Sequence, residues 1–112
     1  MNVSRADILA FLDVVRACRR AGFVRIAEKA REEAALHGWE DDDVYLFLDD
    51  LQPGDFLHRE SPRFSAFDAI WVFTPEIIEP EGRLWIRLAQ QGSTLVVVVS
   101  FHPENFHPED ER

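Results

Sequence analysis

Two apolar segments of strand-like composition, residues 83–90 and 94–102, lie on either side of Gln91-Gly92. The second segment holds four consecutive valines, and β-branched residues favour strands. Strand-like segments joined by a short link with glycine are typical of a β-hairpin. We therefore expect an antiparallel hairpin here, and any fold of this chain must bury one of its faces.

The length of the turn decides which side chains of the hairpin share a face, because side chains alternate along a strand. A two-residue turn at Gln91-Gly92 predicts one mixed face, made of Arg83, Trp85, Arg87, Val96, Val98, Ser100 and His102. The other face is then wholly apolar and should meet the helices; it consists of Leu84, Ile86, Leu88, Leu95, Val97, Val99 and Phe101. A three-residue loop would reverse one strand and change this assignment.

Helical patterns precede the strands. Ser4 and Asp7 form a capping-box-like start, and apolar residues at helical spacing predict a helix that ends at Gly22. A second helix is expected at about residues 25–36, and a short third one begins in the acidic run at 40–43 and stops at Pro53. We interpret the acidic run as a solvated helix start rather than a metal site.

After Gly54 the sequence reads as strands, with turn residues between them. Helices followed by strands predict an α+β fold, with the N-terminal helices packed on one face of a mainly antiparallel sheet. The chain has 112 residues, which fits one domain. We assign residues 1–102 to that domain and 103–112 to an acidic C-terminal tail.

The charge distribution limits the classes of partner. A net charge of −9 counts against simple nucleic-acid binding. However, seven basic residues stand against three acidic ones through Arg31, so a local basic site is compatible with the acidic total. The lone Cys18 is expected to fill the core in a reducing compartment. Without an apolar run that could span a membrane or a signal-peptide pattern, we expect a cytoplasmic protein and no membrane partner.

The mixed face of the hairpin holds candidate functional residues. They are Arg83, Trp85, Arg87, Ser100 and His102, to which the segment FLHRES adds His58 or Arg59. Arginine binds phosphate oxygens, tryptophan can stack on an unpaired base, and histidine transfers protons near neutral pH. These properties together suit RNA cleavage. The alternative is an exposed sheet face with ordinary surface charges.

No metal or cofactor is expected. His102, Glu104, His107 and Glu109 are metal-ligand types, but the prolines among them favour an extended tail and no cysteine pair accompanies them. The repeated Phe-His-Pro-Glu therefore reads as a strand end followed by a tail. Of its two histidines, His102 is the one expected to be functional.

Several segments resemble a known family when taken in order. They are RRAGFVRIAEKAREEAALHGW, LDDLQPGDFLHRES, IWVFTP, GRLWIRL and VVVVSFH. Together they are similar to the MqsR family of type II toxins, over most of the chain from about Arg16 to His102. The resemblance implies a RelE-like fold, an mRNA endoribonuclease that needs no metal, and a cognate antitoxin that inhibits it.

The resemblance also implies which positions act. Carried over by position, His58, Trp85, Arg87 and His102 are the catalytic residues, with His58 and His102 as an acid/base pair. Apart from the resemblance, Arg59, Arg63, Arg83 and Ser100 are expected to bind the substrate. The chain departs from the family pattern at three positions: the family has lysine where His58 stands, commonly tyrosine at Trp85, and glutamine at Val72. The alternative function is a catalytically silent protein-binding module on the same fold.

Overall fold

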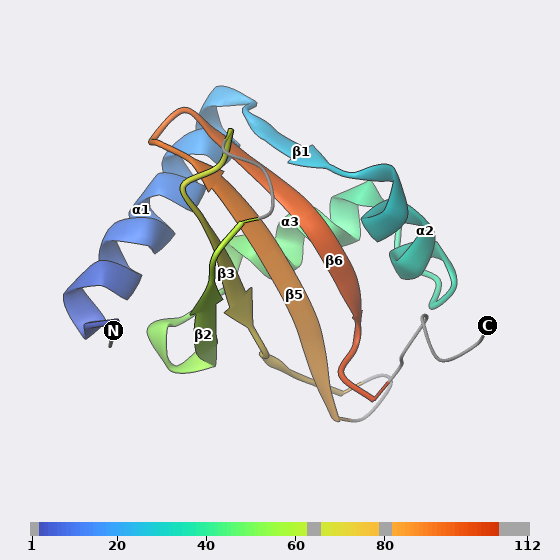
Figure 1. Ribbon diagram of the computed structural model, residues 1–112. Coiled ribbons are helices and arrows are strands. Elements are labelled where there is room, and N and C mark those ends of the chain that lie inside the picture. Colours follow the sequence, from blue (N-terminus) through green and yellow to red (C-terminus); the bar gives the residue numbers. More distant parts are fainter. Residues whose placement is uncertain (1–2, 63–65, 79–81, 106–112) are drawn as a thin grey trace.

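The computed structural model describes residues 3–62, 66–78 and 82–105 (Figure 1). Three α-helices come first in the chain, interrupted by one short strand: α1 Arg5–Ala21, β1 Val24–Ile26, α2 Glu28–Ala35 and α3 Asp41–Asp49. A 3-10 turn and five strands follow: η1 Pro53–Asp55, β2 Phe56–Glu60, β3 Ala69–Phe73, β4 Glu76–Ile77, β5 Gly82–Gln91 and β6 Leu95–Pro103. This order confirms the predicted α+β fold.

The main sheet has the strand order β1-β6-β5-β3-β2, and the short β4 pairs with β5. Strands β2, β3, β5 and β6 form the expected antiparallel meander. Strand β1 was missed, because the sequence reading placed its residues at the start of the second helix. It pairs in parallel with β6, Val24 opposite Val96 and Ile26 opposite Val98, so the sheet is mixed.

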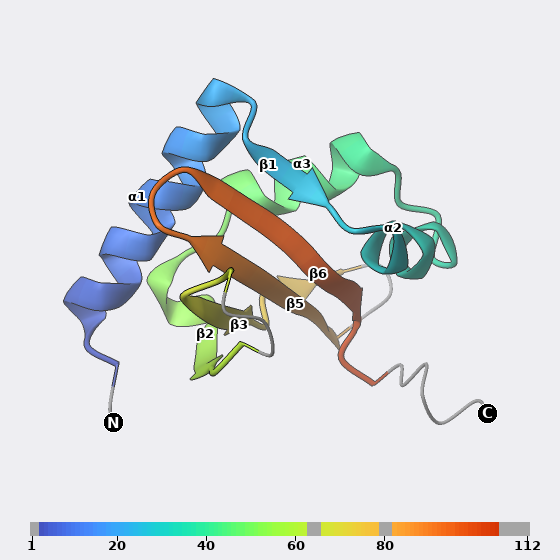
Figure 2. The ribbon, with the colours of Figure 1, turned by 45° about the horizontal axis from the view of Figure 1, so that its top comes forward.

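Helix α1 covers one face of the sheet through its apolar stripe. Its first turn is closed by a capping box between Ser4 and Asp7, as the sequence predicts. Phe11 is 2% exposed and stacks on Trp71 of β3, with ring centroids 4.5 Å apart. Cys18 is buried in the same layer. Helix α3 lies on this side of the sheet as well (Figure 2).

Helix α2 closes the edge of β6 beyond the short β1. Ala30 and Ala34 are fully buried, which brings the helix backbone close to the strand. The buried carboxylate of Glu33 accepts a hydrogen bond from the backbone N–H of Phe101 at 3.0 Å. An acidic side chain thus replaces the missing neighbour strand, because a buried backbone N–H needs an acceptor.

The β5–β6 hairpin differs from the prediction in the length of its loop and in a bulge in β6, and the bulge reverses part of the effect of the loop. Gln91 pairs with Leu95, so the loop has three residues instead of two. This loop puts Val96 and Val98 into the core beside Leu88. Their predicted position on the mixed face is wrong.

A β-bulge then restores the predicted faces near the strand end. Leu88 pairs with Val98 whereas Arg87 pairs with Ser100, so Val99 is an extra residue in β6. An extra residue reverses the alternation of the side chains beyond it. Ser100 and His102 therefore lie on the same face as Arg87 and Trp85, as predicted. The prediction assumed a two-residue turn, whereas the structure reaches this arrangement through a three-residue loop and a bulge.

No helix covers the opposite face of the sheet within the described ranges (Figures 1 and 2). This face, here called the outer face, carries the side chains that alternate with the core residues of β2, β3, β5 and β6. The candidate site residues that the hairpin pattern predicts lie on it.

Candidate functional site

A row of four cross-strand neighbours forms the centre of the outer face. His58 of β2 pairs with Val72 of β3, Val72 with Arg87 of β5, and Arg87 with Ser100 of β6. Side chains in register across adjacent strands lie on the same face. Topology therefore brings together residues from the third and fourth quarters of the chain, and Val72 is the small apolar floor between His58 and Arg87.

Glu60 links His58 and Arg87, the first and third residues of this row. One carboxylate oxygen, Oε2, lies 2.9 Å from Nε2 of His58. The other, Oε1, accepts from Arg87 twice, from Nη2 at 2.8 Å and from Nε at 3.1 Å. A single carboxylate thus holds an imidazole and a guanidinium in fixed positions, and charged partners make these hydrogen bonds stronger than neutral ones.

The sequence reading did not include Glu60 among the candidate residues. A signal for it was present, because residues two apart in a strand share a face and Glu60 follows His58 by two. Considering the alternation of β2 as well as that of the hairpin would have placed both residues together.

The balance of effects on Glu60 favours its charged form. Partial burial raises the pKa of Glu60, but the hydrogen bonds from His58 and Arg87, with the positive charge of these groups, outweigh it. The pKa of Glu60 therefore lies below its ordinary value. The carboxylate is ionised at neutral pH and acts as a hydrogen-bond acceptor on both sides.

Trp85 and Ser100 flank the linked residues. The indole of Trp85 meets the ring of His58 edge-on, with centroids 6.0 Å apart and an interplanar angle of 66°. Ser100 is buried, and its Oγ accepts from Nη1 of Arg87 at 3.5 Å. Ser100 was predicted to bind substrate, but its burial limits it to orienting Arg87.

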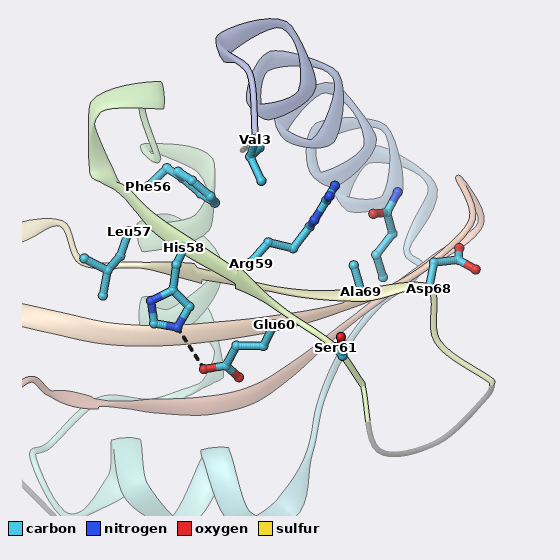
Figure 3. A pocket seen from close by; sticks show the side chains of 10 residues that line it. Val3, Phe56, Leu57, His58, Arg59, Glu60, Ser61, Asp68 and Ala69 are labelled. Carbon is cyan, nitrogen blue, oxygen red and sulfur yellow. Dashed lines mark hydrogen bonds and ion pairs between the residues drawn. The ribbon is translucent and has the colours of Figure 1, made fainter. Parts of the chain in front are cut away.

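An open groove of about 980 Å³ follows β2, the edge strand of the described sheet (Figure 3). His58 and Glu60 lie on one side of the strand, and Arg59 lies on the other (Figure 3). Solvent and ligands can therefore reach the histidine and its carboxylate from the sheet edge. The exposed fractions of their side chains, 44% for His58 and 31% for Glu60, agree with this access.

His102 departs from the prediction. It lies on the outer face opposite Trp85, but it is 7% exposed rather than turned to water. Its Nδ1 lies 2.7 Å from the carbonyl oxygen of Pro103. Since a carbonyl only accepts, Nδ1 carries a proton in this contact. The end of β6 folds the ring against its own backbone, so the expected exposure of His102 is wrong.

Two of the arginines predicted to bind substrate, Arg59 and Arg83, have partners away from Arg87. Arg59 projects to the helical face, where its guanidinium lies 5.3 Å from the ring centre of Trp71. Arg83, four residues before Arg87 on β5, donates to the carbonyl of Thr74 at 2.8 Å and pairs with Glu76. Arg63 lies outside the described residues.

No family model matches this sequence, and no curated protein matches it either. In the described portion of the chain, no helix is long and apolar enough to cross a membrane. The same portion contains no group of three histidine, cysteine or acidic side chains placed to hold a metal ion.

The site combines three chemical capabilities. His58 supplies an imidazole, the side chain that most often transfers protons in catalysis. Arg87 supplies a fixed positive charge with planar donors that match phosphate oxygens. The partly exposed indole of Trp85 offers a face for stacking. A proton-transfer group beside an anion-binding group is the combination that phosphoryl transfer requires.

Proposed function

We propose that this protein is an endoribonuclease that cuts mRNA without a metal ion, as the toxin of a type II toxin–antitoxin pair. The observation that carries the proposal is the linked set His58, Glu60 and Arg87 beside Trp85 on the outer face. The resemblance of the sequence segments to MqsR toxins supports the same activity.

Arg87 retains donors for a phosphate while it is bound to Glu60. A guanidinium has five N–H groups. Glu60 accepts from Nε and Nη2, and Ser100 accepts from Nη1. One N–H on each terminal nitrogen remains beyond the contacts that the described residues make. Two such donors match two oxygens of one phosphate.

The proposed reaction starts at the ribose 2′-hydroxyl. His58 accepts its proton, and the 2′-oxygen attacks the adjacent phosphorus. The bond from phosphorus to the 5′-oxygen of the next nucleotide breaks, and this oxygen takes a proton from solvent. The products are a 2′,3′-cyclic phosphate and a 5′-hydroxyl. Arg87 stabilises the negative charge that develops on the phosphoryl oxygens.

Trp85 is proposed to stack on a base next to the scissile phosphate, which every base allows because each has an aromatic face. The proton donor to the leaving oxygen is assigned to solvent rather than to His102. A ring that is 7% exposed and bonded to its own backbone is poorly placed to reach that oxygen.

The proposed partners are the mRNA substrate and a cognate antitoxin protein, in the cytoplasm where mRNA is translated. The cellular test is expression of the wild-type protein and of His58→Ala from an inducible promoter. Growth arrest by the wild type alone, relieved by the neighbouring open reading frame, is expected. Equal growth of both strains would contradict a toxin role.

The biochemical test is digestion of a long mRNA transcript by the purified protein in EDTA, with both ends of each cut mapped. Wild type should give 2′,3′-cyclic phosphate and 5′-hydroxyl ends, and His58→Ala should give none above background. Arg20→Ala, an exposed change on α1, is the control for loss of one positive charge. Intact RNA with the wild type, or equal cutting by His58→Ala, would reject the proposal.

A protein-binding module is the second candidate function. The groove along the edge strand β2 favours it, because an unpaired sheet edge can accept an added strand from a partner. The net acidic charge also suits a protein partner better than RNA. Absence of RNA cleavage, together with a captured partner whose binding is lost when β2 is altered, would favour this function.

A further inference from the structure

We propose that Glu60 is the positioning residue of the site: its carboxylate fixes the tautomer of His58 and the orientation of Arg87. The inference rests on the proposed ribonuclease function for its kinetic consequences. The statement about the tautomer of His58 is independent of that function and can be tested without RNA.

The tautomer follows from the contact between Glu60 and His58. An ionised carboxylate only accepts hydrogen bonds, so the nitrogen that faces it, Nε2, carries the proton. In the neutral ring, Nδ1 is then the unprotonated nitrogen and the proton acceptor. The same logic operates where a carboxylate holds the histidine of a hydrolytic triad in its working tautomer.

The orientation of Arg87 follows from the second oxygen of the same carboxylate. Because Oε1 accepts from both Nε and Nη2, the edge of the guanidinium that carries these two nitrogens faces Glu60. The second N–H of Nη2 and those of Nη1 lie away from this carboxylate. Ser100 holds Nη1 from the other side. The phosphate-binding donors and the proton acceptor are thereby fixed relative to each other through one side chain.

Glu60 also has an electrostatic effect on both partners. Its negative charge stabilises the imidazolium that forms when His58 takes a proton, and it opposes a phosphate at Arg87. The other groups near His58 are the indole of Trp85, which meets its ring edge-on, and the apolar Val72 of β3. The cation of Arg87 lies on the far side of Val72. Glu60 is the carboxylate that bonds the His58 ring among the described residues.

Glu60→Gln is the decisive variant, because an amide has the shape of the carboxylate but a single acceptor oxygen. Its oxygen can take the place of Oε1 or of Oε2 but not of both, so its NH2 group faces either Arg87 or His58. The expected kcat falls by about 100-fold, at the low end of what a positioned proton acceptor contributes. The KM is expected to stay the same or fall, because a negative charge beside the phosphate is gone.

The matched control is Glu76→Gln, which removes an exposed carboxylate from an Arg–Glu pair outside the site. Its kinetics should equal those of the wild type. A single-site RNA oligonucleotide, taken from the mapped cut, serves as substrate. An unchanged kcat in Glu60→Gln, or a raised KM with kcat unaffected, would overturn the inference. Thermal unfolding of each variant shows whether the fold is kept.

Nitrogen NMR of the histidine rings provides the test that needs no activity. Signals of His58 are assigned by comparison with His58→Ala. The wild type above the titration range of His58 should show the proton on Nε2, and Glu60→Gln should show a mixture or the other tautomer. A wild-type ring protonated on Nδ1 overturns the inference even if RNA is cut. Absence of cutting with the expected tautomer rejects only the ribonuclease function.

Discussion

The side chain of Glu33 and the backbone of Phe101 meet across 68 positions of sequence, and their hydrogen bond of 3.0 Å connects helix α2 to the final strand. Glu33 is 4% exposed, and Lys29 lies 3.2 Å from its second carboxylate oxygen. The contact closes the part of the β6 edge that the short β1 leaves open. It also supports the strand segment that carries Ser100.

Replacing Glu33 by alanine should destabilise the fold. The N–H of Phe101, a fully buried residue, would lose its acceptor, at a cost of about 1–3 kcal/mol in the free energy of unfolding. Glu33→Gln keeps an acceptor and should lose less. Urea unfolding of both variants, with the exposed Glu32→Ala as control, measures this. Equal stability of Glu33→Ala and the control would contradict the role of the contact.

Substitution of Arg87 should strongly reduce the proposed RNA cleavage although the side chain is partly exposed. Arg87→Ala removes the phosphate donors and one partner of Glu60, so kcat/KM for RNA should fall by about 100- to 1000-fold. Arg87→Lys restores the charge without the planar fork and should recover only part of the loss. Steady-state RNA cleavage by the two Arg87 variants is compared with that of the wild type and of the control Arg20→Ala. Full activity of the lysine variant would show that charge alone is needed.

Trp85 should contribute to RNA binding through stacking. Trp85→Ala is expected to weaken binding by about 1–3 kcal/mol, and Trp85→Phe should keep part of it. A 2′-deoxy oligonucleotide of the mapped sequence, which lacks the attacking hydroxyl, isolates binding from cleavage. Fluorescence anisotropy of a labelled oligonucleotide gives the Kd. Identical Kd values for Trp85→Ala and the wild type would exclude stacking.

Stability at acid pH should depend on Glu60. Because the pKa of Glu60 is lowered in the folded protein, its ionised form stabilises the fold above the unfolded-state value of about 4.3. This contribution is lost as the pH falls through the lower, folded-state pKa. The free energy of unfolding should therefore drop less between pH 7 and pH 3 in Glu60→Gln than in the wild type. Parallel pH curves for the two proteins would disagree with the lowered pKa.

His102 should affect stability more than catalysis. His102→Ala removes a buried side chain from the outer face and should lower the unfolding temperature. At a temperature where the variant remains folded, kcat should stay near the wild-type value. A large fall in kcat with an unchanged unfolding temperature would return His102 to the role of proton donor that the sequence suggested.

The fold class was predictable because helical periodicity and strand composition change at one place, near Gly54. Strand β1 was not predictable in the same way. A strand of three residues is too short for its side-chain alternation to be distinguished from the first turn of a helix. These residues form a strand because they pair with β6. Tertiary contacts here override local preference.

The site was predictable in part. Arg87, Trp85 and Ser100 share a face in the sequence reading and in the structure, but only because the bulge at Val99 offsets the longer loop. Neither the loop length nor the bulge can be read from the four consecutive valines, because valine fits the core face and the outer face of the sheet equally well. The burial of His102 depends on how the end of β6 packs, and side-chain alternation does not contain that information.

His58 and Glu60 both belong to β2, a strand that has a hydrogen-bonded neighbour on one side only among the described strands. Peripheral strands open more readily than central ones. Brief detachment of this border strand would separate the proton acceptor from the guanidinium while the remaining meander stays intact. Heating should therefore abolish the proposed RNA cleavage at temperatures where the circular dichroism spectrum is still that of the native protein.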